Sequence, residues 1–97
     1  MFDKLKDLMK LKSQMAQIKK ELDDTIIERT SAADLITISI SGSQVVKDVK
    51  ITGDLKSVST VQLESILKDV INDAIKSSQK EATRKMGQFS GMGQAEA

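Results

Sequence analysis

The chain has 97 residues, carries 15 basic and 14 acidic side chains, and contains no histidine, cysteine, proline, tryptophan or tyrosine. Without cysteine or histidine it lacks the usual ligands of zinc, iron–sulfur clusters and haem, and it has no thiol nucleophile. No side chain has an ordinary pKa near neutrality, and two phenylalanines are too few to stack bases. We therefore expect no enzyme, no metal site, no cofactor and no base-stacking RNA module.

The length suits one small domain. Chains of this size often need a disulfide, a metal or a partner for stability, and the first two are excluded here, so we expect the chain to form an oligomer. The opening MFDKLKDLMKLK has no unbroken apolar stretch of the kind found in signal peptides. No run approaches the roughly 18 apolar residues that a membrane span requires. The absence of cysteine fits a cytoplasmic location.

The near-neutral net charge of +1 hides an uneven distribution along the chain. Residues 1–20 carry a net charge of +4, residues 21–75 carry −5, and residues 76–97 carry +2. Basic ends around an acidic middle indicate a polyanionic partner.

The first element is predicted to be a helix from Phe2 to Asp23. Its apolar residues follow a heptad spacing, and neither glycine nor proline interrupts the segment. A narrow apolar seam on a long helix favours a partner helix, and the alternative is that the seam packs only on its own domain. We predict a dimerisation role for the seam, which consists of Leu8, Leu11, Met15, Ile18 and Leu22.

The middle of the chain changes to the alternating pattern of β-strands. We expect an edge strand at Thr25–Thr30, a second strand at Leu35–Ser41, and a third strand at Val45–Ile51 in which Lys47 marks a bulge. A tight turn between the last two places Gly42 where a positive φ is needed. This predicts a three-stranded antiparallel sheet with one apolar face, and the dimerisation prediction extends to three residues of that face, Ile36, Ile38 and Ile40.

The last element is predicted to be a second long helix. Ser59 and Gln62 form a capping-box pattern that places its start at Thr60, and an apolar stripe from Leu63 to Ile75 is wide enough to cover the sheet. The helix is expected to end at Met86, with Gly87 as the residue after it. We accordingly predict one domain over residues 1–87 and a flexible tail over residues 88–97.

Basic side chains recur on one face of each helix. Lys76, Lys80 and Arg84 are four residues apart, and such stacking of like charges slightly opposes the helix unless an anion lies against it. Phosphates along duplex DNA would suit this array, whereas the simpler interpretation is a solvated face. The candidate DNA-binding residues are Lys4, Lys6, Lys10, Lys12, Lys76, Lys80, Arg84 and Lys85.

Paired carboxylates are the other constellation that could carry chemistry. Asp69 and Asp73 lie one helical turn apart but off the apolar stripe, so we expect them to point to water and Asp73 to pair with Lys76. The glycines match no phosphate-loop spacing, and the methionines are expected to be packing residues rather than metal ligands.

Three segments carry a resemblance to a known family: the opening MF with MKLKSQMAQIKKEL, the central ITISISGSQVVKDVKITGDL, and LESILKDVINDAIKSSQKEATRKMG. In order and spacing they resemble the YbaB/EbfC family of small bacterial nucleoid-associated proteins over nearly the whole chain. Two turns depart from the family pattern. Ala32-Ala33 stands where many relatives have a glycine cluster, and Ser41-Gly42 stands where they have Asn-Gly.

The resemblance implies an α-β-β-β-α fold of the α+β class, with two long helices, that dimerises into a tweezer-like particle. It also implies binding of double-stranded DNA and a role in nucleoid organisation and gene regulation. We therefore expect a cytoplasmic, nucleoid-associated homodimer without a membrane or small-molecule partner. The alternative is a non-enzymatic adaptor whose helices and the residues Met86, Phe89 and Met92 hold a protein partner.

Overall fold

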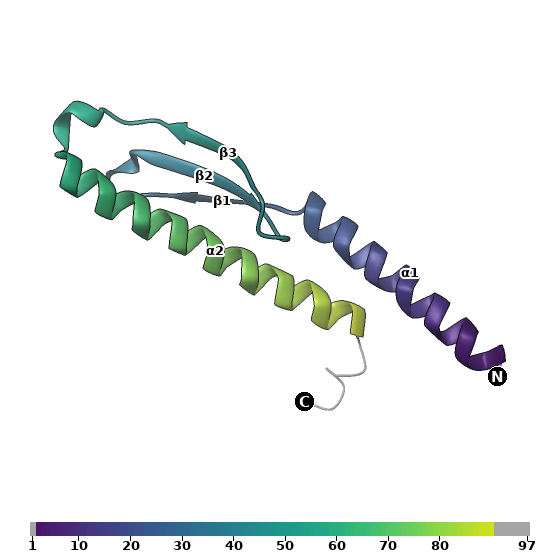
Figure 1. The fold of residues 1–97 in the computed structure, drawn as a ribbon. Helices are drawn as coiled ribbons and strands as arrows, with labels where there is room; N and C mark the ends of the chain where they lie inside the picture. Colours follow the sequence, from purple (N-terminus) through teal and green to yellow (C-terminus); the bar gives the residue numbers. More distant parts are fainter. Residues whose placement is uncertain (1, 91–97) are drawn as a thin grey trace.

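A computed structural model describes residues 2–90 of the chain, and the side chains of residues 4–88. The elements follow the predicted order α-β-β-β-α, which confirms the α+β class (Figure 1). Most of the predicted tail, including Met92, lies outside the described residues. The helices and strands are α1 (Phe2–Asp24), β1 (Ile26–Thr30), β2 (Ile36–Ser41), β3 (Val46–Ile51) and α2 (Thr60–Ser90), with 3-10 turns at Ala32–Asp34 and Leu55–Ser57.

The three strands form an antiparallel sheet in the order β1-β2-β3, as predicted. Ile38 of β2 lies opposite Arg29 of β1 and Val49 of β3, so these three side chains share one face of the sheet. The pairing of β2 with β3 shifts register so that Lys47 is the extra residue, which confirms the predicted bulge.

The core lies between α2 and this face of the sheet. Ile36, Ile38 and Ile40 are only 1–3% exposed and pack with Val70 and Ala74 of α2. Leu63, Ile66, Leu67 and Ile75 of the α2 stripe pack around them, whereas Ile71 stays 43% exposed. The other face of the sheet carries mainly hydroxyl and charged side chains. Burial of the isoleucines drives α2 onto the sheet, and it leaves them little surface for a second chain.

The start of α2 agrees with the sequence prediction, but its end does not. At the start of the helix, the backbone N–H of Gln62 donates a hydrogen bond to the Ser59 hydroxyl (3.1 Å). In return, the backbone N–H of Ser59 donates to the side-chain oxygen of Gln62 (2.9 Å), which confirms the capping box. The predicted end at Met86 is wrong, because the helix continues through Gly87 to Ser90. Glycine inside a helix costs only about 1 kcal/mol relative to alanine, too little to stop a helix of otherwise good formers.

The β2–β3 turn also departs from the prediction. The residue with positive φ is Gln44 (φ 67°), and Gly42 stays outside that region. Gly42 suits the turn for a different reason: a Cβ there would lie 3.1 Å from both Cδ2 and the backbone oxygen of Leu22, which is a tight contact. The turn is therefore in close contact with the C-terminal end of α1.

Hydroxyl and carboxylate groups join α1, the turn and α2. Ser43 donates a hydrogen bond to Asp23 of α1 (2.5 Å) and shares another with the Ser41 hydroxyl (2.8 Å). The fully buried Ser78 hydroxyl of α2 donates to the Ser41 carbonyl (2.7 Å). From this point toward its N-terminus, α1 projects away from the body of the molecule (Figure 1). The whole molecule, including this helix, measures 66 × 27 × 17 Å. We call the part of α1 that projects from the body, residues 4–17, the arm.

The seam of α1 lies mostly on the arm. Leu8, Leu11 and Met15 are more than half exposed within the single chain, whereas Ile18 and Leu22 are half-buried at the base. The alternative that the seam packs only on its own domain therefore does not describe its N-terminal part.

The turn between β1 and β2 contains an unusual backbone conformation at Ala33 (φ 61°, ψ 15°). A left-handed conformation disfavours alanine by roughly 1–2 kcal/mol and glycine hardly at all. We expect Ala33→Gly to raise the free energy of unfolding by about 1 kcal/mol, measured by urea denaturation. The neighbouring Ala32 has no positive φ, so Ala32→Gly should lower stability instead. Equal shifts in both variants would contradict the explanation.

Candidate nucleic-acid interface

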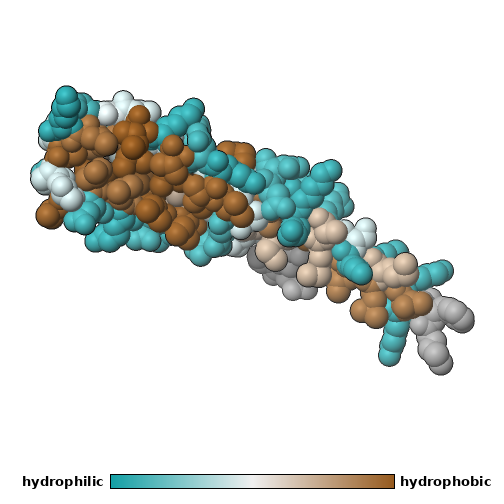
Figure 2. Space-filling view, turned by 45° about the horizontal axis from the view of Figure 1, so that its top comes forward, coloured by the Kyte–Doolittle hydropathy of each residue, from teal (hydrophilic) through white to brown (hydrophobic). Residues whose placement is uncertain are grey.

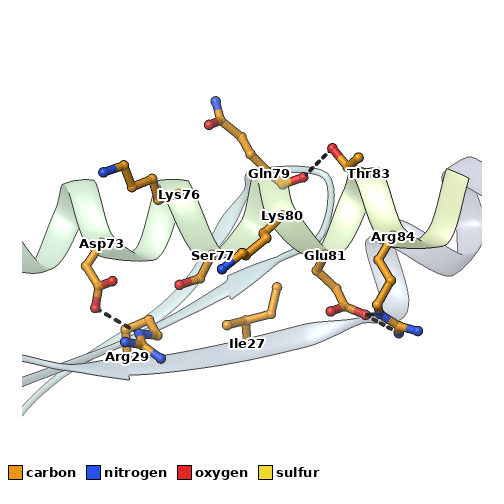
Figure 3. A pocket seen from close by; sticks show the side chains of 10 residues that line it. All are labelled: Ile27, Arg29, Asp73, Lys76, Ser77, Gln79, Lys80, Glu81, Thr83 and Arg84. Atoms are coloured by element: carbon orange, nitrogen blue, oxygen red, sulfur yellow. Dashed lines mark hydrogen bonds and ion pairs between the residues drawn. The ribbon is translucent and has the colours of Figure 1, made fainter. Parts of the chain in front are cut away.

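An open groove of about 1100 Å³ runs along α2 on the side of β1 (Figure 3). It forms because β1 ends the sheet on this side and α2 extends beyond it. We call it the basic groove. It is lined by Ile27, Arg29, Asp73, Lys76, Ser77, Gln79, Lys80, Glu81, Thr83 and Arg84.

One wall of the basic groove is an ion pair between the sheet and the helix. The Arg29 Nε donates to Asp73 Oδ2 at 2.8 Å, and both side chains remain nearly half exposed. The predicted pairing of Asp73 with Lys76 is wrong. Asp73 is on the flank of α2 that faces β1, where Arg29 lies in register with Ile38 on the covered face of the sheet. Lys76 instead points away from the sheet (Figure 3).

A second ion pair, between Glu81 and Arg84, lies about two turns further along α2. Arg84 donates through Nε (3.0 Å) and through a terminal nitrogen to the same carboxylate oxygen of Glu81. The hydrogen bond from Arg84 holds the pKa of the Glu81 carboxyl below its ordinary value, and the same bond raises the pKa of Arg84. Both groups are therefore charged at neutral pH.

Lys76 and Lys80 make no ion pair with any of the residues that the structure describes. Both are exposed, and hydroxyl and amide groups lie beside them at Ser77, Gln79 and Thr83. Ammonium groups next to hydroxyl and amide donors suit phosphate oxygens. The basic groove can therefore bind an extended polyanion through contacts that do not depend on base identity.

The structure brings together only some of the predicted DNA-binding residues. Lys76, Lys80 and Arg84 line the basic groove. Lys85 lies on another side of α2, where it is 23% exposed and lies 3.8 Å from the carboxylate of Glu21 in α1. The other four predicted residues are exposed on the arm and line no part of the groove: Lys4, Lys6, Lys10 and Lys12.

Sequence reasoning missed Arg29 and Glu81 as parts of this site. The signal for Arg29 was present, because it follows Ile27 by two residues and so shares the apolar face of an edge strand. A charge on that face needs a partner from whatever covers it. Glu81 carried the simpler signal of an acidic residue three positions before Arg84.

The opposite flank of α2 borders an apolar surface. Helix α2 packs mainly on β1 and β2, so Val46, Val49 and Ile51 of β3 stay 50–60% exposed on the face that α2 covers elsewhere. Ile71, 43% exposed, lies on the flank of α2 away from Asp73. We call these four residues the β3 patch. Figure 2 shows hydrophobic residues gathered over the body within a hydrophilic rim.

Neither a metal site nor a membrane span is found among the residues that the structure describes. Among the described residues, no group of three or more histidine, cysteine, aspartate or glutamate side chains could hold a metal ion. In the same part of the chain, neither long helix is apolar enough to cross a membrane.

Fold and groove together define a small α+β protein with a basic flank, an apolar flank and a projecting lysine-rich helix. The model of the YbaB/EbfC DNA-binding family matches residues 1–93, so the chain belongs to that family. This confirms the resemblance seen in the sequence.

Individual relatives agree with this assignment. The chain is 31% identical over 87 residues to a nucleoid-associated protein of Dictyoglomus turgidum, covering 89% of this chain and 84% of that protein. It is 30% identical over 86 residues to a nucleoid-associated protein of Lactococcus lactis, and the match covers 88% of this chain and 87% of that protein. An uncharacterized protein of Helicobacter pylori has the same fold, with a TM-score of 0.73, 24% identity, and coverage of 95% of this chain and 97% of that one.

Proposed function

We propose that the protein is a non-enzymatic, nucleoid-associated homodimer that binds double-stranded DNA and contributes to nucleoid organisation and gene regulation in the cytoplasm. The observation that carries the proposal is the basic groove, where Lys76 and Lys80 form no ion pair with the described residues and lie near Arg29 and Arg84. Membership of a DNA-binding family and the names of the relatives support it.

The contacts are mainly to phosphates. Lysines spaced along an exposed helix present point charges, and both arginines of the groove are engaged by carboxylates, which favours phosphate contacts over bidentate reading of a base edge. The exposed lysines of the arm, Lys4 to Lys12, extend the basic surface away from the body. This arrangement favours binding with little sequence discrimination.

The dimer forms through the apolar flank. Monomers rarely expose many large apolar side chains together, and here the β3 patch and the Leu8–Met15 part of the seam are both uncovered. A two-fold axis would bring the same patch from two chains together. Because the basic groove lies on the other flank of α2, it stays open in such a dimer. Ile36, Ile38 and Ile40 would support the interface from beneath rather than contact the partner.

Titration with salt tests the proposal. A dimer that contacts about six phosphates should lose roughly 10³-fold in affinity between about 50 and 200 mM salt, with a log–log slope near −5. The measurement is fluorescence anisotropy with a random-sequence duplex, on a sample whose mass has been determined by light scattering. Absence of binding at the lowest salt would contradict the proposal, and capture of a protein partner by such a sample would favour the adaptor alternative.

A further inference from the structure

We propose that Glu81 limits the affinity of the basic groove by occupying Arg84, so that a DNA phosphate gains Arg84 only in exchange for this carboxylate. The inference rests on the proposed function and adds to it an acidic residue that determines affinity. It follows from the pairing pattern of the four cations in the groove.

The Arg84–Glu81 geometry uses the part of the guanidinium that a phosphate would need. Nε and one terminal nitrogen of Arg84 both donate to the same oxygen of Glu81. Arginine recognises phosphate through two parallel N–H donors on one edge of its fork. Since Glu81 occupies one such edge, Arg84 cannot offer it to DNA while the pair is formed.

The other arginine of the groove is held in a different way. Asp73 binds Arg29 across the gap between α2 and β1, so that pair joins two elements of the fold. Glu81 and Arg84 lie three residues apart on the same helix, beyond the point where Ser78 contacts the end of β2. Their pair joins no two elements, and breaking it leaves the contacts of the core in place.

Exchange of the carboxylate for a phosphate is feasible because the pair is accessible. The side chain of Arg84 is 55% exposed and that of Glu81 is 25% exposed. Exposed ion pairs contribute little net stability, so a competing phosphate has little to overcome. Lys76 and Lys80, which form no ion pair within the described part of the chain, would hold the DNA nearby and raise the local concentration of phosphate.

A double-mutant cycle on the full-length protein tests the inference. Dissociation constants are measured by anisotropy for the wild type, Glu81→Gln, Arg84→Gln and the double variant. We expect Glu81→Gln to bind duplex DNA about 3–10-fold more tightly, with a salt slope steeper by about 0.9 per protomer, because one more phosphate is engaged. Arg84→Gln should weaken binding less than about twofold in the wild type but about 5–10-fold in the Glu81→Gln background.

The matched control is Glu64→Gln, which removes the same charge from an exposed residue near the start of α2, roughly 25 Å from Glu81 along the helix. That distance exceeds the Debye length of about 10 Å at 0.1 M salt, so affinity should change less than twofold. Equal effects of Glu64→Gln and Glu81→Gln, or additive effects in the cycle, would overturn the inference while the proposed function stands. Absence of DNA binding by the wild type would overturn both the inference and the proposed function.

Discussion

Simultaneous replacement of Lys76, Lys80 and Arg84 by glutamate is expected to abolish the gel shift of duplex DNA. The change removes the cations of α2 that line the basic groove and puts three carboxylates in their place, on both protomers of a dimer. Affinity should fall by more than about 10³-fold at 0.1 M salt, because contacts are lost and repulsion is added. The measurement is an electrophoretic shift with a random-sequence duplex, alongside circular dichroism and light scattering.

The control for this experiment is a triple variant with the same change in charge elsewhere. Lys50, Lys56 and Lys68 are exposed and line no part of the groove, so their replacement by glutamate should leave most of the binding. Because three added carboxylates weaken the helix, the glutamine version of the groove variant provides a milder test. The log–log salt slope of DNA binding should be smaller in magnitude by several units for this glutamine variant than for the wild type. Unchanged binding in the groove variants would remove these residues from the site.

A triple variant in the arm tests whether α1 contributes to DNA binding. Replacing Lys6, Lys10 and Lys12 by glutamate should weaken binding as well, since these residues are exposed along the projecting part of the helix. Comparison with the groove variant then ranks the two basic surfaces.

Introducing a charge into the β3 patch is expected to convert the proposed dimer into a monomer. In an isologous interface Val49→Glu buries two carboxylates at roughly 3 kcal/mol each, which would raise the dimer dissociation constant by roughly 10⁴-fold. Val49 is 52% exposed in the single chain, so the fold should tolerate the change. Light scattering across a range of concentrations measures the result, and the salt slope of DNA binding should drop to about half.

A matched substitution distinguishes the patch from apolar surface in general. Val61, 74% exposed near the start of α2, lies outside the β3 patch, and Val61→Glu should leave the dimer intact. A substitution in the core should instead destabilise the fold. Ile38 is 3% exposed, so Ile38→Ala should lower the free energy of unfolding by about 2–5 kcal/mol rather than act on association alone. A dimeric Val49→Glu variant would contradict the assignment of the interface to β3.

Much of the fold could be predicted because its signals are local. The reciprocal hydrogen bonds of Ser59 and Gln62 involve residues three apart, and the bulge at Lys47 follows from a break in alternation. Apart from the end of α2, the errors came where distant residues decide the local structure. A side chain at Gly42 would crowd Leu22, which packs on the turn, and no pattern around the turn contains that information.

The site was predictable to the extent that one helix builds it. Spacing of four residues placed Lys76, Lys80 and Arg84 on one face without reference to the rest of the fold. The contribution of β1 required the tertiary structure, since Arg29 and Asp73 are 44 positions apart in the chain. The partner of Asp73 was misassigned for the same reason: a neighbour on its own helix was considered, but the sheet supplied a closer one.

The junction at the base of α1 would be the pivot of any tilt of that helix. The helix has 23 residues and is held at one end by the Asp23–Ser43 hydrogen bond and by Leu22 against Gly42. At 1.5 Å per residue it is about 34 Å long, so a tilt of about 10° at the pivot moves the tip by about 6 Å. That displacement is close to the rise of two base pairs, about 7 Å. If the arm binds DNA as proposed, the phosphates within reach of Lys4 and Lys6 would depend on a few hydroxyl and carboxylate groups at the opposite end of the helix.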